Sequence, residues 1–197
     1  KGLNPFLISF SKTFQMPFTT CEIPGLVIVE PAVFEDSRGY FFEGYNQNLF
    51  QQNGITAHFV QDNQSKSSYG VLRGLHYQLN PHAQAKLVRV LEGSILDVAV
   101  DIRKSSPTYG QHFALELSAE NKKQLYIPEG FAHGFSVLTP TAVVLYKCNT
   151  FYNKQSEGGI RFDDPKLAID WKIDAGKAII SEKDQQLPYF EDATNNF

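Results

Sequence analysis

The sequence has few of the residues on which several protein classes depend. Its 197 residues include only two cysteines, one methionine and one tryptophan. Cys21 and Cys148 lie far apart and have no metal-ligand spacing, which argues against a disulfide framework and a zinc site. We therefore expect two free thiols and a reducing cytoplasm. No apolar run is long enough to span a bilayer, so no membrane association is expected.

The chain also lacks an excess of positive charge. A net charge of −3 and a pI near 6.0 leave no basic footprint, which argues against nucleic acid as a partner. An anionic small molecule needs only a few local cations, so the overall charge does not exclude that kind of ligand.

Aromatic and short apolar segments are abundant. The 16 Phe and 9 Tyr favour strands over helices. Strand-like segments separated by Gly, Pro and Asn turns, without helical crossovers, predict an all-β sandwich or barrel. The expected strands are Leu26–Val29, Tyr40–Glu43, His58–Val60, Val71–Gln78, Lys86–Glu92, Ser94–Asp101, His112–Leu117, Gln124–Ile127, Gly134–Leu138 and Ala142–Cys148.

Helical signal is limited to two places. One is a short segment at Asn46–Gln52, where Asn46 can act as the N-cap, and the other is the stretch after Asp164. Met16 precedes the first organised part of the chain. Residues 1–15 are expected to be a leader or a segment added by cloning, followed by one domain over residues 16–197.

Two of the five histidines lie in apolar, strand-like surroundings, His76 in Val71–Gln78 and His133 in Ile127–Phe135. An idle imidazole is costly to bury, so each is either a hydrogen-bonded core histidine or part of the chemistry. Strand alternation separates His76 from Arg73. If both serve one pocket, Gly74 must mark a β-bulge.

Alternation also predicts the direction of one tyrosine. Tyr146 shares a strand face with Ala142, Val144 and Cys148, so its ring should point inward while Lys147 points away.

Several long motifs occur in order between about Pro24 and Asp184. Together they resemble the dTDP-4-dehydrorhamnose 3,5-epimerase family. The resemblance implies a cupin-type jelly roll, a homodimer, no metal or other cofactor, and an isomerase acting on a dTDP-4-keto-6-deoxyhexose in dTDP-L-rhamnose synthesis for cell-surface polysaccharide. The motifs are Gln61–Asn63, Val71–Gln78, Asp97–Arg103 with Ser106–Gly110, Ser118–Gln124 and Ile127–Phe135.

The residue types suit this chemistry. C3 and C5 of a 4-keto sugar are both α to the carbonyl, so a base can remove either proton, and inversion needs an acid on the opposite face. By resemblance, His76 is the base, Asp184 its partner and Tyr146 the acid. Taken alone, Asp184 reads as a solvated carboxylate in a charged turn, and Tyr146 as a buried aromatic residue.

The enolate oxygen needs a cation or a hydrogen-bond donor, whose loss typically costs about 3 kcal/mol of barrier lowering. Lys86 is the candidate, because it begins an apolar segment where a solvated face explains it poorly. His133 could supply a second donor or orient the sugar, or it could be a structural histidine in a tight turn.

The resemblance implies a wider substrate-binding set, in which arginine suits the diphosphate through its bidentate fork. Arg38 and Glu43 could equally form a surface ion pair, or their segment could reach a neighbouring subunit's pocket. Besides His133, the set comprises Arg38, Glu43, Gln61, Asp62, Asn63, Arg73, Glu157 and Lys183.

Other functions compete with this interpretation. A metal-dependent cupin would typically use a His-x-His pair and a downstream Glu, whereas this chain has Gln78 and Lys86 in those places. A non-catalytic sugar-nucleotide-binding module would have no use for an acid and a base. Epimerisation at C3 only or C5 only also remains open, because Phe151 stands where many members of the family carry the first of two tyrosines.

Overall fold

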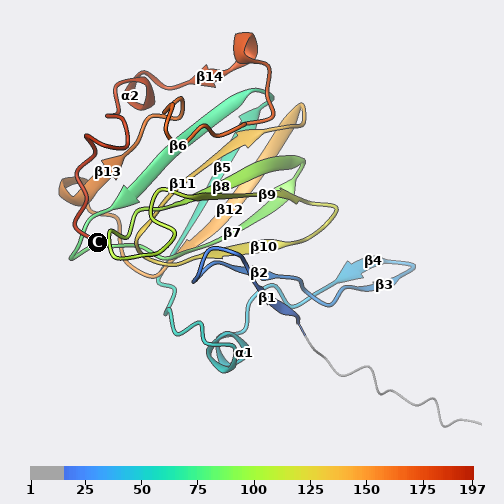
Figure 1. Ribbon diagram of the computed structural model, residues 1–197. Coiled ribbons are helices and arrows are strands. Elements are labelled where there is room, and N and C mark those ends of the chain that lie inside the picture. Colours follow the sequence, from blue (N-terminus) through green and yellow to red (C-terminus); the bar gives the residue numbers. More distant parts are fainter. Residues whose placement is uncertain (1–15) are drawn as a thin grey trace, which may run out of the picture.

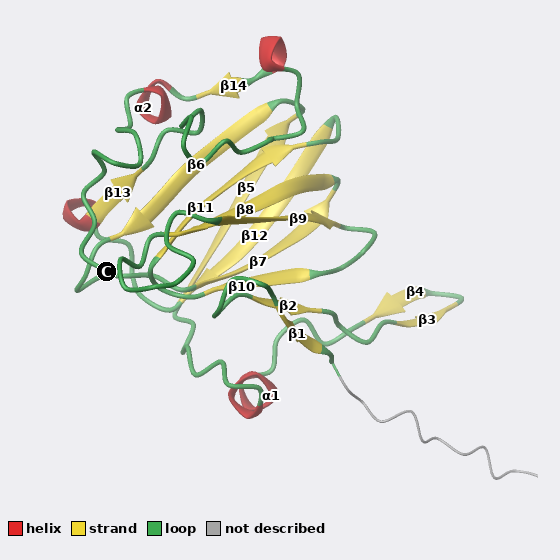
Figure 2. Cartoon of the chain, in the orientation of Figure 1, coloured by secondary structure: helices red, strands yellow, loops and turns green. Residues whose placement is uncertain are grey.

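The computed structural model describes residues 16–197, so the prediction for residues 1–15 lies outside it. Two six-stranded sheets pack face to face, as Figures 1 and 2 show. The first has the order β1 (Phe18–Thr20), β2 (Val27–Val29), β10 (Gln124–Ile127), β7 (Lys86–Glu92), β12 (Thr141–Cys148) and β5 (Gln61–Ser68). The second has the order β13 (Glu157–Gly159), β6 (Val71–Gln78), β11 (Phe131–Val137), β8 (Ser94–Asp101) and β9 (His112–Ser118), with β14 (Ile179–Ile180) parallel to β6.

Helices are short and peripheral. They are α1 (Gln47–Gln52), α2 (Glu182–Gln185) and the 3₁₀ turns Lys154–Ser156 and Ala175–Lys177. A separate hairpin of β3 (Phe34–Asp36) and β4 (Gly39–Phe41) projects away from both sheets in Figure 1. Within residues 16–197, no helix is long and apolar enough to cross a membrane.

The main core lies between the two sheets, where Val88 and Val144 of one pack with Ile95 and Phe135 of the other. Burying apolar faces in this way is the main driving force for such a sandwich. A second cluster lies outside the β6 sheet under the C-terminal segment, and includes Trp171. The predicted all-β jelly roll is confirmed.

Most of the predicted elements are found. Strands β6, β7, β8 and β10 have the predicted boundaries, and the Asn46 side chain caps α1 by accepting hydrogen bonds from the backbone of Asn48 and Leu49. The strand predicted at His58–Val60 is wrong, because β5 begins at Gln61, although the Val60 N–H still donates to the Cys148 carbonyl. The expectation of helix after Asp164 is largely wrong as well, because that segment is mostly irregular and covers the second sheet.

The bulge expected at Gly74 is present. Arg73 pairs with Phe135 and His76 with His133, so two residues of β6, Gly74 and Leu75, face one residue of β11. Gly74 has φ +120°, and a Cβ there would lie 2.6 Å from the Cα of Gly134, so only glycine fits. The bulge brings Arg73 and His76 to the same cavity.

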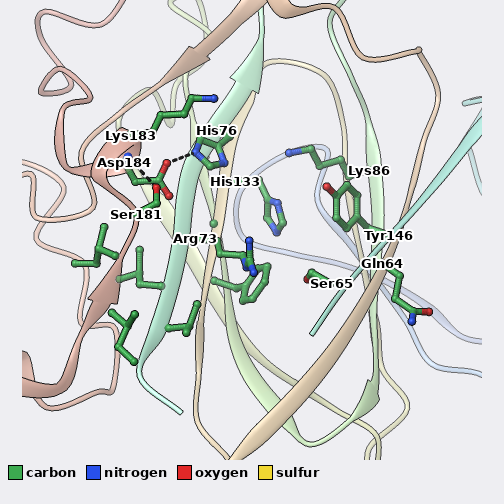
Figure 3. A pocket seen from close by; sticks show the side chains of 16 residues that line it. Gln64, Ser65, Arg73, His76, Lys86, His133, Tyr146, Ser181, Lys183 and Asp184 are labelled. Atoms are coloured by element: carbon green, nitrogen blue, oxygen red, sulfur yellow. Dashed lines mark hydrogen bonds and ion pairs between the residues drawn. The ribbon is translucent and has the colours of Figure 1, made fainter. Parts of the chain in front are cut away.

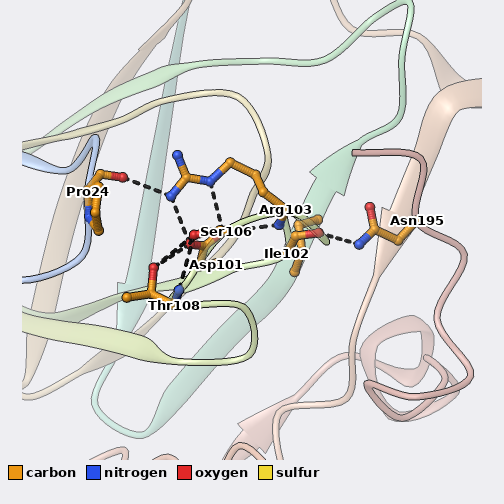
Figure 4. A network of polar contacts seen from close by, with 7 residues as sticks. All are labelled: Pro24, Asp101, Ile102, Arg103, Ser106, Thr108 and Asn195. Carbon is orange, nitrogen blue, oxygen red and sulfur yellow. Dashed lines mark hydrogen bonds and ion pairs between the residues drawn. The ribbon is translucent and has the colours of Figure 1, made fainter.

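A network of polar contacts links the end of β8 to segments near both ends of the described chain (Figure 4). The buried Asp101 carboxylate accepts hydrogen bonds from Arg103 and from the hydroxyls of Ser106 and Thr108. Arg103 also donates to the Pro24 carbonyl, and Asn195 donates to the Ile102 carbonyl. Burial works to raise the pKa of Asp101, but hydrogen bonds from Arg103, Ser106 and Thr108 outweigh it and lower this pKa to about 2.

Candidate active site

A cavity of about 520 Å³ lies between the two sheets and is the meeting point of side chains from distant parts of the chain. The second sheet supplies Arg73 and His76 from β6 and His133 from β11, and the first sheet supplies Lys86 and Tyr146. Figure 3 shows Lys86 and Tyr146 on the side of the cavity opposite His76 and Asp184. The cavity therefore has ionisable groups on two facing walls.

His76 and Asp184 form a hydrogen-bonded pair, with 2.7 Å between His76 Nε2 and Asp184 Oδ1. The other carboxylate oxygen accepts the backbone N–H of Gly74, and the Ser181 side chain caps the first turn of α2. Burial alone would raise the pKa of Asp184, but the hydrogen bonds from His76 and Gly74 lower it, so the carboxylate stays ionised. An ionised acceptor holds the Nε2–H tautomer of neutral His76 and leaves Nδ1 free to take a proton.

His133 forms a second histidine–aspartate pair, more deeply buried, with 2.7 Å from its Nε2 to Asp97 Oδ1. Burial lowers the pKa of His133, and Asp97 only partly opposes this effect. Neutral His133 then donates to Asp97 and keeps an acceptor at Nδ1, which favours orienting a sugar hydroxyl over supplying a second donor. The other oxygen of Asp97 is fully buried and has no hydrogen-bond partner within residues 16–197.

Lys86 and Tyr146 lie side by side, with Lys86 Nζ 5.9 Å from the centre of the Tyr146 ring. The tyrosine points inward, as alternation along the strand predicts, while Lys147 pairs with Asp62 on the other face. Burial raises the pKa of Tyr146, so its phenol keeps the proton that an acid must supply. Burial also lowers the pKa of Lys86, an effect opposed by Cys148 and Asp97.

A smaller recess of about 180 Å³ continues from the cavity and shares His76, Lys86 and Tyr146 with it. It is lined mainly by amides and by side chains at the protein surface. These are Gln61, Asn63, Gln78, Gln84, Tyr152 and Glu157. An elongated ligand could thus extend from the ionisable groups of the cavity into a recess rich in hydrogen-bonding amide groups.

Known proteins resemble this chain in both sequence and fold. Residues 20–192 match the family model described as dTDP-4-dehydrorhamnose 3,5-epimerase. The chain belongs to this family of isomerases. It is 54% identical over 173 residues to the dTDP-4-dehydrorhamnose 3,5-epimerase of Shigella flexneri, covering 87% of this chain and 94% of that protein.

Solved structures of epimerases extend the comparison to the fold. The crystal structure of dTDP-4-dehydrorhamnose 3,5-epimerase from Elizabethkingia anophelis has a TM-score of 0.87 and 58% identity, covering 90% of this chain and 97% of that chain. A dTDP-6-deoxy-D-glucose-3,5-epimerase from Legionella pneumophila, solved in complex with dTDP-4-keto-L-rhamnose, has a TM-score of 0.86 and 47% identity, covering 90% of this chain and 94% of that chain.

The structure brings most of the predicted site residues of this epimerase together. They line the cavity, the recess or both. The residues that meet in this way are Gln61, Asn63, Arg73, His76, Lys86, His133, Tyr146, Glu157, Lys183 and Asp184. Lys183 of the cavity and Glu157 of the recess are also ion-paired with each other.

Three predicted substrate-binding residues lie elsewhere in the chain. Asp62 lies on the outward face of β5 and pairs with Lys147, because alternate residues of a strand face opposite sides. Asp62 does not line the cavity or the recess beside Gln61 and Asn63, and its role in substrate binding stays a prediction. Arg38 pairs with Asp36 in the exposed hairpin, and Glu43 accepts a hydrogen bond from Asn46, so the two do not form the considered ion pair with each other.

Several residues of the site were missed from the sequence, among them Asp97 and Gln84. Asp97 has a recognisable signal, because an aspartate within the otherwise apolar segment Ile95–Val100 must be paired when buried. Gln84 has no such signal, since only the folding of its loop brings it to the recess. No group of three or more His, Cys, Asp or Glu side chains arranged to hold a metal ion occurs within residues 16–197.

Proposed function

We propose that the protein epimerises C3 and C5 of dTDP-4-dehydro-6-deoxy-D-glucose to give dTDP-4-dehydro-L-rhamnose, with His76 as the base and Tyr146 as the acid. The observation that carries the proposal is their position on facing walls of one cavity, His76 on β6 of one sheet and Tyr146 on β12 of the other. Inversion of a carbon requires this arrangement, because the proton must leave one face and arrive at the other.

Each half-reaction conserves protons and electrons. Nδ1 of His76 takes the proton from C3 or C5, and the C–H electron pair moves to form an enolate whose negative charge lies on the C4 oxygen. The ammonium group of Lys86 stabilises that oxygen. The enolate then collapses back to the ketone as its carbon takes the phenolic proton of Tyr146 on the opposite face. Before the second carbon reacts, the His76 imidazolium releases its proton to solvent and the Tyr146 phenolate takes one from solvent.

Asp184 supports the base in two ways. Its carboxylate holds the His76 tautomer that leaves Nδ1 free, and its negative charge stabilises the imidazolium formed after proton removal. Because hydrogen bonds lower the pKa of Asp184, it remains an anion while His76 gains and loses a proton.

Cationic and amide groups around the cavity suit the dTDP portion of the substrate. Arg73 supplies positive charge at the cavity wall, Lys183 adds an ammonium group that is ion-paired with Glu157, and the recess offers hydrogen-bonding amide groups. Guanidinium and ammonium groups are the usual protein contacts of a diphosphate.

A homodimer would explain the projecting hairpin. The hairpin exposes apolar side chains, and Phe41 is 66% exposed. Arg38 lies between β3 and β4, well before the cavity-lining residues in the sequence. We propose that this hairpin packs on a second subunit and brings Arg38 and Glu43 to that subunit's site. The free thiols Cys21 and Cys148 suit a cytoplasmic enzyme.

The reaction is tested by incubating the protein with dTDP-4-dehydro-6-deoxy-D-glucose and determining the configuration of the product by NMR. Inversion at both C3 and C5 is expected. Inversion at one carbon would replace the proposal with a single-site epimerase, and an unchanged substrate would contradict epimerisation altogether.

Mixing two inactive variants tests the shared site. If Arg38 serves the neighbouring subunit, heterodimers of Arg38→Ala and His76→Ala contain one site with both residues intact, so mixing and re-equilibrating the subunits should restore activity. Each variant re-equilibrated alone is the control. Failure of the mixture to regain activity, although mixed dimers are detected by mass spectrometry, would contradict the shared site.

A further inference from the structure

The edge strand β5 has an unusual inner face. Its alternate residues Gln61, Asn63, Ser65 and Ser67 point toward the interior, whereas the facing positions of its neighbour β12 are apolar or aromatic. Strands of a sandwich normally direct apolar side chains to the interior. A polar inner face on β5 is therefore expected to serve either a ligand or the residues that hold one.

Ser67 is the most enclosed of these four positions, with 8% of its surface exposed. Its hydroxyl oxygen accepts a hydrogen bond from Nε of Arg73 at 3.2 Å. The bond joins the two sheets across the turn between β5 and β6, since Ser67 lies near the end of one strand and Arg73 near the start of the next.

The Arg73 side chain has few other polar contacts within the described residues. Among residues 16–197, this bond is the only hydrogen bond of its side chain, and no carboxylate pairs with it. Its two terminal amino groups are thus available at the cavity wall, where Figure 3 shows the side chain. An arginine fixed through Nε retains the planar fork with which guanidinium groups bind pairs of oxygens.

We infer that Ser67 is a positioning residue that fixes the Arg73 guanidinium through Nε and directs its terminal amino groups toward an oxygen of the sugar nucleotide. The inference rests on the proposed role of Arg73 in substrate binding. Ser67 itself need not touch the substrate. The hydrogen bond to Ser67 already restricts the Arg73 side chain before substrate binds. Arg73 therefore loses less conformational entropy on binding.

A double-mutant cycle tests the inference, with Ser67→Ala, Arg73→Ala and the double variant compared in KM and kcat for the sugar nucleotide and in Kd for dTDP. Ser67→Ala should raise KM about fivefold, a size typical of one hydrogen bond, and change kcat by less than about twofold. In the Arg73→Ala background, the same substitution should have no further effect. Ser68→Ala, on the exposed face of the same strand, is the matched control and should match the unmodified protein.

The outcomes separate the inference from the assignment on which it rests. The inference would be overturned if Ser67→Ala raised KM as much in the Arg73→Ala background as in the unmodified protein. It would also be overturned if Arg73→Ala weakened binding while Ser67→Ala had no effect. No effect of Arg73→Ala on either KM or Kd would overturn the proposed role of Arg73 itself. Weaker dTDP binding would assign the Arg73 contact to the diphosphate, and a change confined to KM would assign it to the sugar, both in support of the inference.

Discussion

Two buried aspartates of this protein, Asp101 and Asp184, are both ionised but differ in what surrounds them. Asp101 is enclosed by Arg103 and two hydroxyl groups and is completely inaccessible. One oxygen of Asp184 accepts a hydrogen bond from a backbone N–H, and the other is bonded to His76. The His76 side chain is 34% exposed at the cavity. One carboxylate is bonded to permanent donors, and the other to a group that can change its charge.

The comparison shows why burial of a charge does not by itself indicate function. Arginine and serine keep their protonation states at every ordinary pH, so the Asp101 network can only hold the chain together. The imidazole of His76 can take up a proton at Nδ1 while Nε2 stays bonded to Asp184, so this pair can take part in proton transfer. Substitutions in the two regions should therefore separate activity from stability.

The largest effect is expected from His76→Asn, which removes the base while keeping a polar side chain. The kcat should fall about 10³-fold, within the range typical of general base catalysis. Asp184→Asn should also cripple turnover, because an amide does not hold the His76 tautomer or stabilise the imidazolium. Steady-state kinetics and thermal unfolding of the same samples test this prediction, and a lower Tm that fully accounts for the lost activity would contradict it.

Asp101→Asn should have the opposite effect. Loss of the carboxylate leaves the Arg103 guanidinium without its partner and should cost about 3 kcal/mol of folding free energy. For a domain of this size, Tm should fall by roughly 6 to 12 °C. Turnover per folded molecule, measured well below Tm, should remain near that of the unmodified protein, and a kcat loss like that of His76→Asn would contradict the structural role.

The contribution of Asp101 should also depend on pH. Its pKa is about 2 in the folded protein, below the ordinary value of 3.8, so the ionised carboxylate stabilises the native state. The stability difference between the unmodified protein and Asp101→Asn should be constant above about pH 5 and shrink as pH falls from about 4 toward 2. Denaturant unfolding at several pH values measures it. A difference that grows on acidification would contradict the network.

Much of the fold could be predicted because the alternation of apolar and polar residues indicates which side chains of a strand are buried. Alternation predicted β12 and the inward direction of the Tyr146 ring. The glycine in β6 predicted the bulge that brings Arg73 and His76 to one cavity. The pattern failed at β5, whose inner face is polar and whose outer face is exposed, so hydrophobic alternation is absent. Pairing with β12 forms this strand.

The site was predictable to a lesser extent. His76 and Tyr146 lie 70 residues apart on different sheets, and only the resemblance to the epimerase family joined them with Asp184 before the fold was known. The Asp97–His133 pair depends on the register between β8 and β11, which no local pattern encodes. Arg38 and Glu43 stay predictions, because their proposed role requires a second subunit.

The most direct test of the central claim compares Tyr146→Phe with the unmodified enzyme in deuterated water, following C3 and C5 of dTDP-4-dehydro-6-deoxy-D-glucose by NMR. If His76 removes the protons and Tyr146 returns them on the opposite face, the variant should still exchange deuterium but invert about 100-fold more slowly. The unmodified enzyme should show exchange with inversion at both carbons. Normal inversion by Tyr146→Phe would contradict the assignment of Tyr146 as the acid.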